Sequence, residues 1–239
     1  MKLIVIGSGS KGNSYALKAE NGETLLIEAG IKIRDVKRTL HYDGSIVGCI
    51  CSHRHGDHFS HAREYINNGI DIFSNPDAIE ILKEGTMLRT GRSHTINSFT
   101  VTPFSVDHDV MNYGYLIHHH EMGTLCFATD CYNISSIIKG VNHWLIEANY
   151  DDGIVLNNLF NGIMDRAQYR RLMLAHFSLD NCIKYLHDCN AEKSSDITLI
   201  HLSSRNSDGE VFKRIISQEF GVPCNIATHG LNIRLYGSL

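Results

Sequence analysis

A cluster of potential metal ligands stands at residues 52–58, which read SHRHGDH. Three histidines and one aspartate follow the pattern His-x-His-x-Asp-His, at His53, His55, Asp57 and His58. Histidine nitrogen and carboxylate oxygen are common ligands of divalent transition metals. An extended loop that leaves a rigid strand can aim two side chains at one point and two at a second. The spacing therefore predicts a pair of metals about 3.5–4 Å apart that polarise one substrate and share a water.

Three further potential ligands come at or just after the ends of apolar runs elsewhere in the chain, at His108, Asp130 and His201. A lone histidine at a strand end is more often structural than functional. Three such residues at three predicted strand ends, in a chain that already carries the 52–58 cluster, favour one shared site. The alternative interpretation of residues 52–58 is a solvated polar loop.

The elements that must position these residues are short β-rich runs that alternate with helical patterns. Strands are predicted at 2–6, 15–19, 24–30, 45–52, 70–75, 98–106, 112–119, 124–130, 143–149 and 196–203, with two short strands in the tail. Helices are predicted at 33–42, 61–69, 76–85, 178–190 and 208–220. Strand clusters with helices between and outside them predict an α/β fold in which two sheets pack together under helices on both faces.

Composition limits the alternatives. The 239 residues show no linker, repeat or low-complexity segment, so we expect a single domain over 1–239. The 22 basic and 26 acidic residues give a net charge of −4, which argues against a generally cationic nucleic-acid binder but not against a local basic patch. Seven cysteines without a Cys-x-x-Cys pair predict buried, reduced thiols and, with no signal peptide, a cytoplasmic location. No apolar run is long enough to span a membrane.

The ligand pattern and its order along nearly the whole chain resemble the metallo-β-lactamase fold superfamily. The resemblance implies a four-layer αβ/βα sandwich with the metals at one edge. It implies that one metal is held by His53, His55 and His108, a second by Asp57, His58 and His201, and that Asp130 bridges them. β-Lactamases of the thiolate-ligated kind have cysteine at the bridging position. Asp130, with Cys131 only beside it, argues against lactam hydrolysis.

Four segments are similar to the YycJ/WalJ-type proteins, which are regarded as cytosolic metal-dependent DNA exonucleases. These are GSGSKGNSY (7–15), IEANYD (146–151), AHFSLDN (175–181) and HLSSRNS (201–207). The sequence departs from that pattern because Ala175 replaces a glycine and two residues intrude between Ser178 and Asn181. The same region is similar to tRNase Z, which implies that His176 contacts the phosphate or donates a proton and that Glu147 orients His176.

The resemblance thus implies a dinuclear phosphodiesterase, a DNA exonuclease above all, in which a hydroxide shared by two divalent metals attacks phosphorus. The ligand types fit Zn²⁺, Mn²⁺ or Fe²⁺. Asp57 or Asp130 could accept the hydroxide proton, and His176 could donate one to the leaving oxygen. DNA is favoured over RNA as the partner.

Cationic side chains before His176 are candidates for a nucleic-acid track, at Arg166, Arg170 and Arg171. Asn13, in the Gly/Ser-rich loop 7–14, is a candidate phosphate contact, but we expect Ser10, Asn13 and Ser14 to support the site instead. The run His118–His120 is expected at an exposed hairpin tip, without a catalytic role.

Two alternatives stay open. The negative net charge favours a small or cyclic phosphodiester, or a thioester, as the substrate. A regulatory or binding module without catalysis is the second alternative, but a decayed site would not need every expected ligand.

Overall fold

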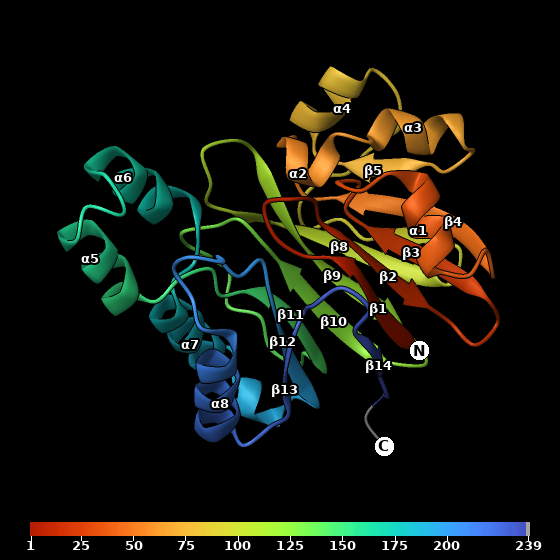
Figure 1. Cartoon of the computed structure of the whole chain (residues 1–239). Helices are drawn as coiled ribbons and strands as arrows, with labels where there is room; N and C mark the ends of the chain where they lie inside the picture. The colour runs from red at the N-terminus through yellow and green to blue at the C-terminus, as the bar shows by residue number, and fades with distance from the viewer. Residues whose placement is uncertain (238–239) are drawn as a thin grey trace.

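Two seven-stranded sheets that face each other form the centre of this computed structural model, which describes residues 1–237 (Figure 1). The first sheet has the order β14 (Asn232–Arg234), β1 (Lys2–Gly7), β2 (Ser14–Lys18), β3 (Glu23–Ile27), β4 (Ser45–Cys51), β5 (Ile72–Ser74) and β6 (Thr86–Met87). The second has the order β13 (Cys224–Ile226), β12 (Asp196–Ile200), β11 (His143–Glu147), β10 (Gly123–Ala128), β9 (Asn112–His119), β8 (Phe99–Val106) and β7 (His94–Ile96).

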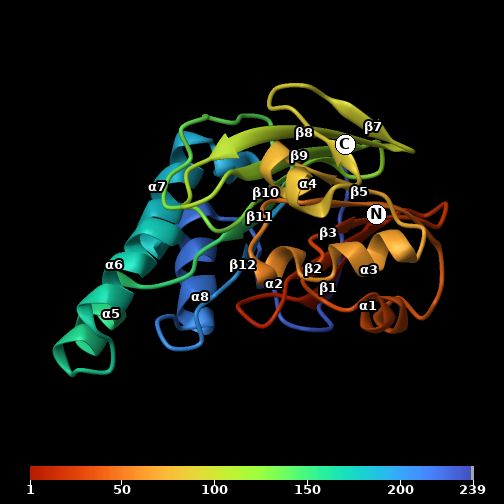
Figure 2. The ribbon, with the colours of Figure 1, turned by 90° about the horizontal axis from the view of Figure 1, so that it is seen from above.

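Helices cover the outer face of each sheet (Figures 1 and 2). Those over the first sheet are α1 (Ile33–Thr39), α2 (Gly56–Phe59), α3 (Ala62–Asn67) and α4 (Pro76–Leu82). Those over the second are α7 (Leu179–Asp188) and α8 (Gly209–Phe220), with the short helix η1 (Ala191–Lys193) nearby. A further pair, α5 (Asp152–Phe160) and α6 (Arg166–Ala175), projects beyond the sheets in both views. The predicted four-layer αβ/βα sandwich is confirmed.

The apolar runs in the strands are continuous because both faces of each sheet are buried. In β1, Leu3 and Val5 join the core between the two sheets, whereas Ile4 and Ile6 join the core beneath the helices. This alternation is the two-residue period of a strand. Trp144 belongs to a third core under α7 and α8. The sandwich therefore rests on three apolar layers, one between the sheets and one on each outer side.

The carboxyl ends of parallel strands bring distant segments to one rim. In the first sheet β3 and β4 are parallel, with Ile27 beside Ile50. In the second sheet β10, β11 and β12 are parallel, with Glu147 beside Ile200 at their ends. Ligands in open α/β sheets bind outside the carboxyl ends of strands. Residues that directly follow these strands are therefore placed where a site can form.

The structure differs from the predicted elements at two places. The extended loop expected after β4 holds only through His55, because Asp57 and His58 lie on the helical turn α2. Helices α5 and α6 were not predicted. A readable signal for α6 was its capping box, in which the side chains of Asp165 and Gln168 each accept the other residue's backbone N–H.

Two other expectations can be compared with residues 1–237. All seven cysteines are buried free thiols, as predicted. None of the helices in this part of the chain has the length and apolar character that crossing a bilayer would require.

Gly30 generates the first testable prediction, because it lies where the segment after β3 touches the loop that follows β4. A Cβ atom added there would lie 1.8 Å from the Asp57 carbonyl oxygen and 2.7 Å from the Asn13 nitrogen. We predict that Gly30→Ala lowers the free energy of unfolding by about 1–3 kcal/mol through overpacking. Gly56→Ala is the matched control, because Gly56 lies in the segment after β4 that Gly30 touches and nothing lies within 4 Å of its added Cβ. Equal midpoints of the two variants in urea denaturation would contradict the prediction.

Candidate metal centre

All of the predicted metal ligands meet at the rim formed by the carboxyl ends of the strands. They are His53, His55, Asp57, His58, His108, Asp130 and His201. They follow β4 in the first sheet and β8, β10 and β12 in the second. Two groups, each with all possible ligand atoms within 4.8 Å of one another, together contain these seven residues, and Asp130 belongs to both. A third such group combines Asp130 and His201 with Glu147 and His176. The first two groups contain the same residues that the resemblance assigned to the two metals, with the predicted bridge between them.

The first group contains His53, His55, His108 and Asp130. His55 Nδ1 lies 3.2 Å from His108 Nε2, and His53 Nε2 lies 3.9 Å from Asp130 Oδ2. Ser52 Oγ holds the other ring nitrogen of His53, Nδ1, at 2.9 Å. Nε2 of His53 is buried and has no hydrogen-bond partner within residues 1–237. Leaving a buried polar atom unpaired is costly, so a cation at this point would fit the residues present.

The second group contains Asp57, His58, Asp130 and His201. Asp57 Oδ2 lies 3.3 Å from His201 Nε2 and 3.4 Å from His58 Nε2. Asp130 lies 3.4 Å from His58 Nε2 and 3.3 Å from His201 Nδ1. Ligand atoms at about 2.0–2.1 Å from a tetrahedral Zn²⁺ stand about 3.3–3.4 Å apart. The separations therefore suit ligands around one cation better than direct charge-assisted hydrogen bonds, which are shorter.

The carboxylates control the protonation of the histidines in this centre. Burial disfavours the charged form of His201, but Asp130, Asp57 and Glu147 outweigh it and raise its pKa to about 10. Burial likewise opposes a charge on His58, yet Asp130 and Glu28 raise its pKa well above the ordinary value. Burial would raise the pKa of Asp130, but His201 and His58 hold it well below its usual range. The surrounding carboxylates therefore favour the charged, doubly protonated forms of His58 and His201 over the neutral forms.

His176 and Glu147 form the predicted pair beside the second group. His176 Nδ1 lies 2.7 Å from Glu147 Oε1, and Glu147 Oε2 accepts backbone N–H groups from Cys131 at 3.1 Å and Phe177 at 3.2 Å. Burial lowers the pKa of His176, but the Glu147 carboxylate more than compensates and raises it. The His176 ring stacks on His201 at a centroid distance of 5.3 Å. His176 thus stands at the edge of the centre with one face on a ligand.

Two supporting residues were missed by sequence reasoning. Glu28, which directly follows β3, is fully buried, and its carboxylate lies 3.5 Å from His58 Nδ1. Asn149, just beyond β11, donates to the His201 carbonyl oxygen at 2.6 Å and lies 3.2 Å from His201 Nδ1. The available signal for Glu28 was its place at a strand end, which it shares with the ligands themselves. Both residues orient a ligand histidine from behind.

The Gly/Ser-rich loop supports the centre, as expected. Asn13 is fully buried, and its Oδ1 accepts the Gly9 N–H at 2.7 Å. Its Nδ2 lies 3.1 Å from His58 Nε2 and 3.2 Å from the Asp57 carbonyl oxygen. The Asn13 side chain has no exposed surface and its polar atoms are engaged within the protein, which favours the supporting role over a phosphate contact. Ser8 Oγ accepts the His201 N–H at 2.9 Å and fixes a second ligand.

Only one of the predicted cationic residues reaches the centre. A cavity of about 210 Å³ lies over the ligands, and Arg171 of α6 lines it together with His176. All three arginines are exposed, but Arg166 and Arg170 do not line this cavity. The two are four residues apart and share one face of α6, whereas Arg171 is turned toward the centre.

The run His118–His120 lies at the tip of the hairpin between β9 and β10, and His118 and His120 are exposed, as predicted. His119 is buried rather than exposed, and its Nε2 lies 3.0 Å from Ser98 Oγ. His119, His120 and Glu121 could in principle hold a metal. However, His119 Nδ1 accepts the Glu121 N–H at 3.2 Å, and the Glu121 carboxylate binds the N-terminal amine at 2.7 Å. Because these side chains are already engaged in hydrogen bonds and an ion pair, we interpret the group as structural and not as a metal site.

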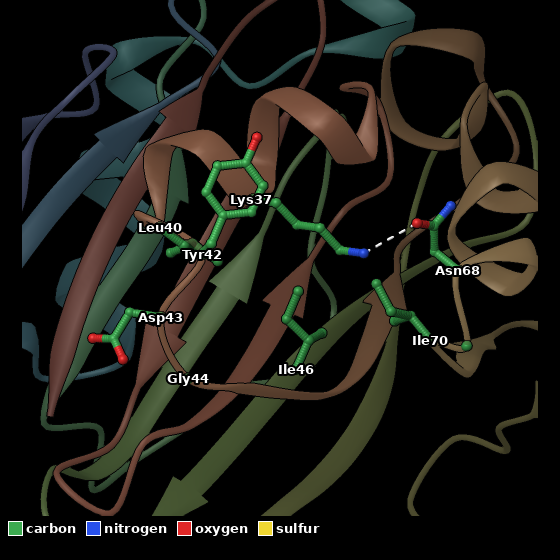
Figure 3. A pocket seen from close by; sticks show the side chains of 9 residues that line it. Lys37, Leu40, Tyr42, Asp43, Gly44, Ile46, Asn68 and Ile70 are labelled. Atoms are coloured by element: carbon green, nitrogen blue, oxygen red, sulfur yellow. Dashed lines mark hydrogen bonds between the residues drawn. The ribbon is translucent and has the colours of Figure 1, made fainter.

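A separate cavity of about 240 Å³ lies at the opposite end of β4 from the metal centre (Figure 3). Its walls include Ile46 and Ile70, and Lys37 Nζ donates to Asn68 Oδ1 at 3.0 Å. The one carboxylate in its lining, Asp43, pairs with Lys18 at 2.6 Å. This cavity has no cluster of ligand side chains and is not part of the centre.

Comparison with solved structures gives the same architecture. The metallo-β-lactamase fold protein YhfI from Bacillus subtilis matches with a TM-score of 0.75 and 16% identity over 98% of this chain and 99% of that one. Zn²⁺-bound PqqB from Methylobacterium extorquens matches with a TM-score of 0.74 and 13% identity over 98% and 100%. The short form of human tRNase Z matches with a TM-score of 0.67 and 15% identity over 98% and 99%. No protein-family model and no curated protein matches the sequence. The chain is therefore similar to these proteins in structure, and its fold is the metallo-β-lactamase fold.

Proposed function

We propose that this protein is a metal-dependent hydrolase that cleaves phosphodiester bonds, with DNA as the favoured substrate and exonucleolytic cleavage as the favoured mode. One observation carries the proposal: two groups of ligands share Asp130, and the His176–Glu147 pair stands directly beside them. A zinc-bound protein and a tRNase Z among the similar structures support it. The seven free thiols support the expected cytoplasmic location.

The residues present fit two divalent cations. His53, His55 and His108 would hold one, with the unpaired Nε2 of His53 as the clearest sign. Asp57, His58 and His201 would hold the other, and Asp130 would contact both. When bound, such cations lower the pKa of a shared water and neutralise charge on the phosphate oxygens. Nitrogen and oxygen ligands without a thiolate suit Zn²⁺, Mn²⁺ or Fe²⁺.

The chain's own residues orient the water and supply the proton. Asp57 is partly exposed at the centre, and although burial opposes its ionisation, His201 and His58 lower its pKa, so it is ionised and can orient the attacking water by accepting its hydrogen bond. His176 faces the same cavity and can donate a proton to the leaving oxygen through Nε2, because Nδ1 is bound to Glu147. Water thus adds to phosphorus, the bond to the leaving oxygen breaks, and the products are a phosphomonoester and an alcohol.

A small or cyclic phosphodiester is the second candidate substrate. The presence of a single arginine in the lining of the central cavity, and the net charge of −4, favour it over a long strand. A thioester would make less use of the His176–Glu147 pair, because a thiolate leaving group needs little proton donation. A purely regulatory role would leave the full ligand set without a purpose.

The proposal is tested by metal analysis of the purified chain, followed by assays with Zn²⁺ or Mn²⁺. The substrates are labelled single- and double-stranded DNA, RNA and bis(p-nitrophenyl) phosphate. We expect hydrolysis with DNA preferred, and Asp57→Asn should reduce it to background while the circular dichroism spectrum stays native. A metal-loaded protein that leaves every phosphodiester intact would refute the proposal. Full cellular function of Asp57→Asn would indicate a regulatory module.

Metal binding should release protons, since a cation must displace those on His58 and His201. We predict about two protons released per chain at pH 7 when Zn²⁺ or Mn²⁺ binds, and weaker binding as the pH falls. The measurement is isothermal titration calorimetry in buffers of different ionisation enthalpy. His201→Ala should release about one proton fewer. A binding enthalpy that does not depend on the buffer would contradict this prediction.

The Glu147–His176 contact predicts a pH effect. His176 must be protonated to donate, so activity should fall as the pH rises through its pKa. Glu147→Gln removes the charge that raises this pKa, and the alkaline limb of the kcat profile should therefore move to lower pH. His176→Ala should reduce kcat on DNA by about 10²–10⁴-fold. Its effect on bis(p-nitrophenyl) phosphate should be smaller, because that leaving group needs less protonation. An unchanged alkaline limb in Glu147→Gln would show that the pair has another role.

A further inference from the structure

A second cavity adjoins the metal centre. Its volume is about 320 Å³, and its lining includes Arg171 and His176, which also line the cavity over the ligands. The two cavities therefore meet at these two side chains. The remaining walls come from the α5–α6 pair and from the turn that follows β12. A substrate at the metal centre would therefore lie next to this second cavity, with His176 and Arg171 between them.

The second cavity is positively charged. Arg171 and Arg205 line it, and the lining contains no carboxylate. Neither guanidinium has an ion pair or side-chain hydrogen bond within residues 1–237. Arg54 and Arg234, by contrast, each pair with a carboxylate at 2.7 Å. Two free guanidiniums on one cavity, in a chain of net charge −4, indicate a site for an anion such as a phosphate.

Hydrogen bonds hold the backbone at Arg205, while its side chain is exposed. The buried Asn158 of α5 donates to the Arg205 carbonyl oxygen at 3.1 Å and to Asn206 Oδ1 at 3.0 Å. The Asn206 carbonyl oxygen in turn accepts the Asp151 N–H at 2.8 Å. These bonds tie the turn after β12 to the start of α5 and to its interior. With the backbone held in this way, only the Arg205 side chain has to be ordered when a ligand binds.

The other walls of the cavity combine the amide side chains of Asn158, Gln168 and Asn206 with three apolar side chains. Ile163 is 61% exposed, and Met164 and Leu172 are half-buried beside it. Exposed apolar surface next to cationic groups suits a ligand with both characters, such as a nucleotide with a flat base or sugar and a charged phosphate. His176 stands between the two cavities and donates its proton to the leaving oxygen. The second cavity is therefore on the leaving-group side of the scissile bond.

We propose that the second cavity binds the leaving portion of the substrate and recognises a phosphate on it through Arg171 and Arg205. Preferred substrates are then phosphodiesters whose leaving group is a nucleotide, not a nucleoside or a simple alcohol. This inference rests on the proposed hydrolase function and names the substrate class of that site. It also assigns Arg205, which sequence reasoning did not select, as a specificity residue.

The first test uses the metal-loaded protein and compares kcat/KM for three forms of the thymidine dinucleotide. One form has no terminal phosphate, one has a 5′-phosphate and one has a 3′-phosphate. We expect the form that carries a phosphate on its leaving nucleotide to be preferred by about tenfold or more. Arg205→Ala, which alters the second cavity alone, should bring this ratio close to one. Arg214→Ala, an exposed arginine of α8 that lines neither cavity, is the control and should keep the ratio. If the wild-type protein prefers neither the 5′-phosphorylated nor the 3′-phosphorylated form over the unphosphorylated dinucleotide, the inference is overturned.

The second test is independent of turnover. Metal-free protein is titrated with thymidine 5′-monophosphate and with thymidine in a calorimeter. We expect the monophosphate to bind and Arg205→Ala to weaken it by about tenfold or more, with thymidine bound far more weakly. Equal binding by wild type and Arg205→Ala would overturn the inference even if bis(p-nitrophenyl) phosphate is hydrolysed. Arg205-dependent binding in a loaded protein that hydrolyses nothing would support the cavity and refute the hydrolase.

Discussion

The arrangement around Asp130 is the constraint on which the rest of the structure depends. This carboxylate is only 3% exposed, and a buried charge is costly unless it is paired. His53, His58 and His201 surround it at 3.3–3.9 Å and come from both sheets. The histidines compensate the anion with protons in the metal-free protein, and cations would do so in the loaded one. The buried negative charge of Asp130 thus accounts for the raised histidine pKa values. It also explains why histidines from both sheets have to surround this carboxylate.

The convergence of these side chains requires unfavourable backbone conformations at the strand ends. Glu28, Asp130 and His201 have φ values of 70°, 46° and 53°, in the left-handed region that side chains other than glycine rarely adopt. Such conformations cost about 1–3 kcal/mol each and persist where surrounding bonds over-determine them. Asn112 donates to the Asp130 carbonyl oxygen at 2.7 Å, and Asn149 holds that of His201 at 2.6 Å. The strain turns side chains that leave neighbouring strands toward a common point.

How far sequence predicted the structure depends on the distance over which each contact acts. The local spacing of His53 to His58 and the apolar runs of the strands were enough to predict a metal-binding cluster and two sheets under helices, whereas the division of seven residues between two metals came from the resemblance to a known family. The Glu147–His176 contact was found only through resemblance to known families, and the pKa shifts needed coordinates. Glu28, 30 positions before His58, and Arg205, which depends on α5, were missed because nothing local marks them. Asn13 contacts His58 and the Asp57 carbonyl oxygen, and no local pattern in the sequence reveals these long-range contacts.

The candidate ligands are divided between the two sheets, so the centre is complete only when both sheets have formed and packed together. The segment after β4 carries His53 and Asp57, but Asp130 and His201 are made later and belong to the opposite sheet. A growing polypeptide of half the final length would therefore present an incomplete set of ligands. High-affinity cation capture has to wait until both halves have docked. All of these side chains can therefore contact one cation pair only after the two sheets have packed against each other.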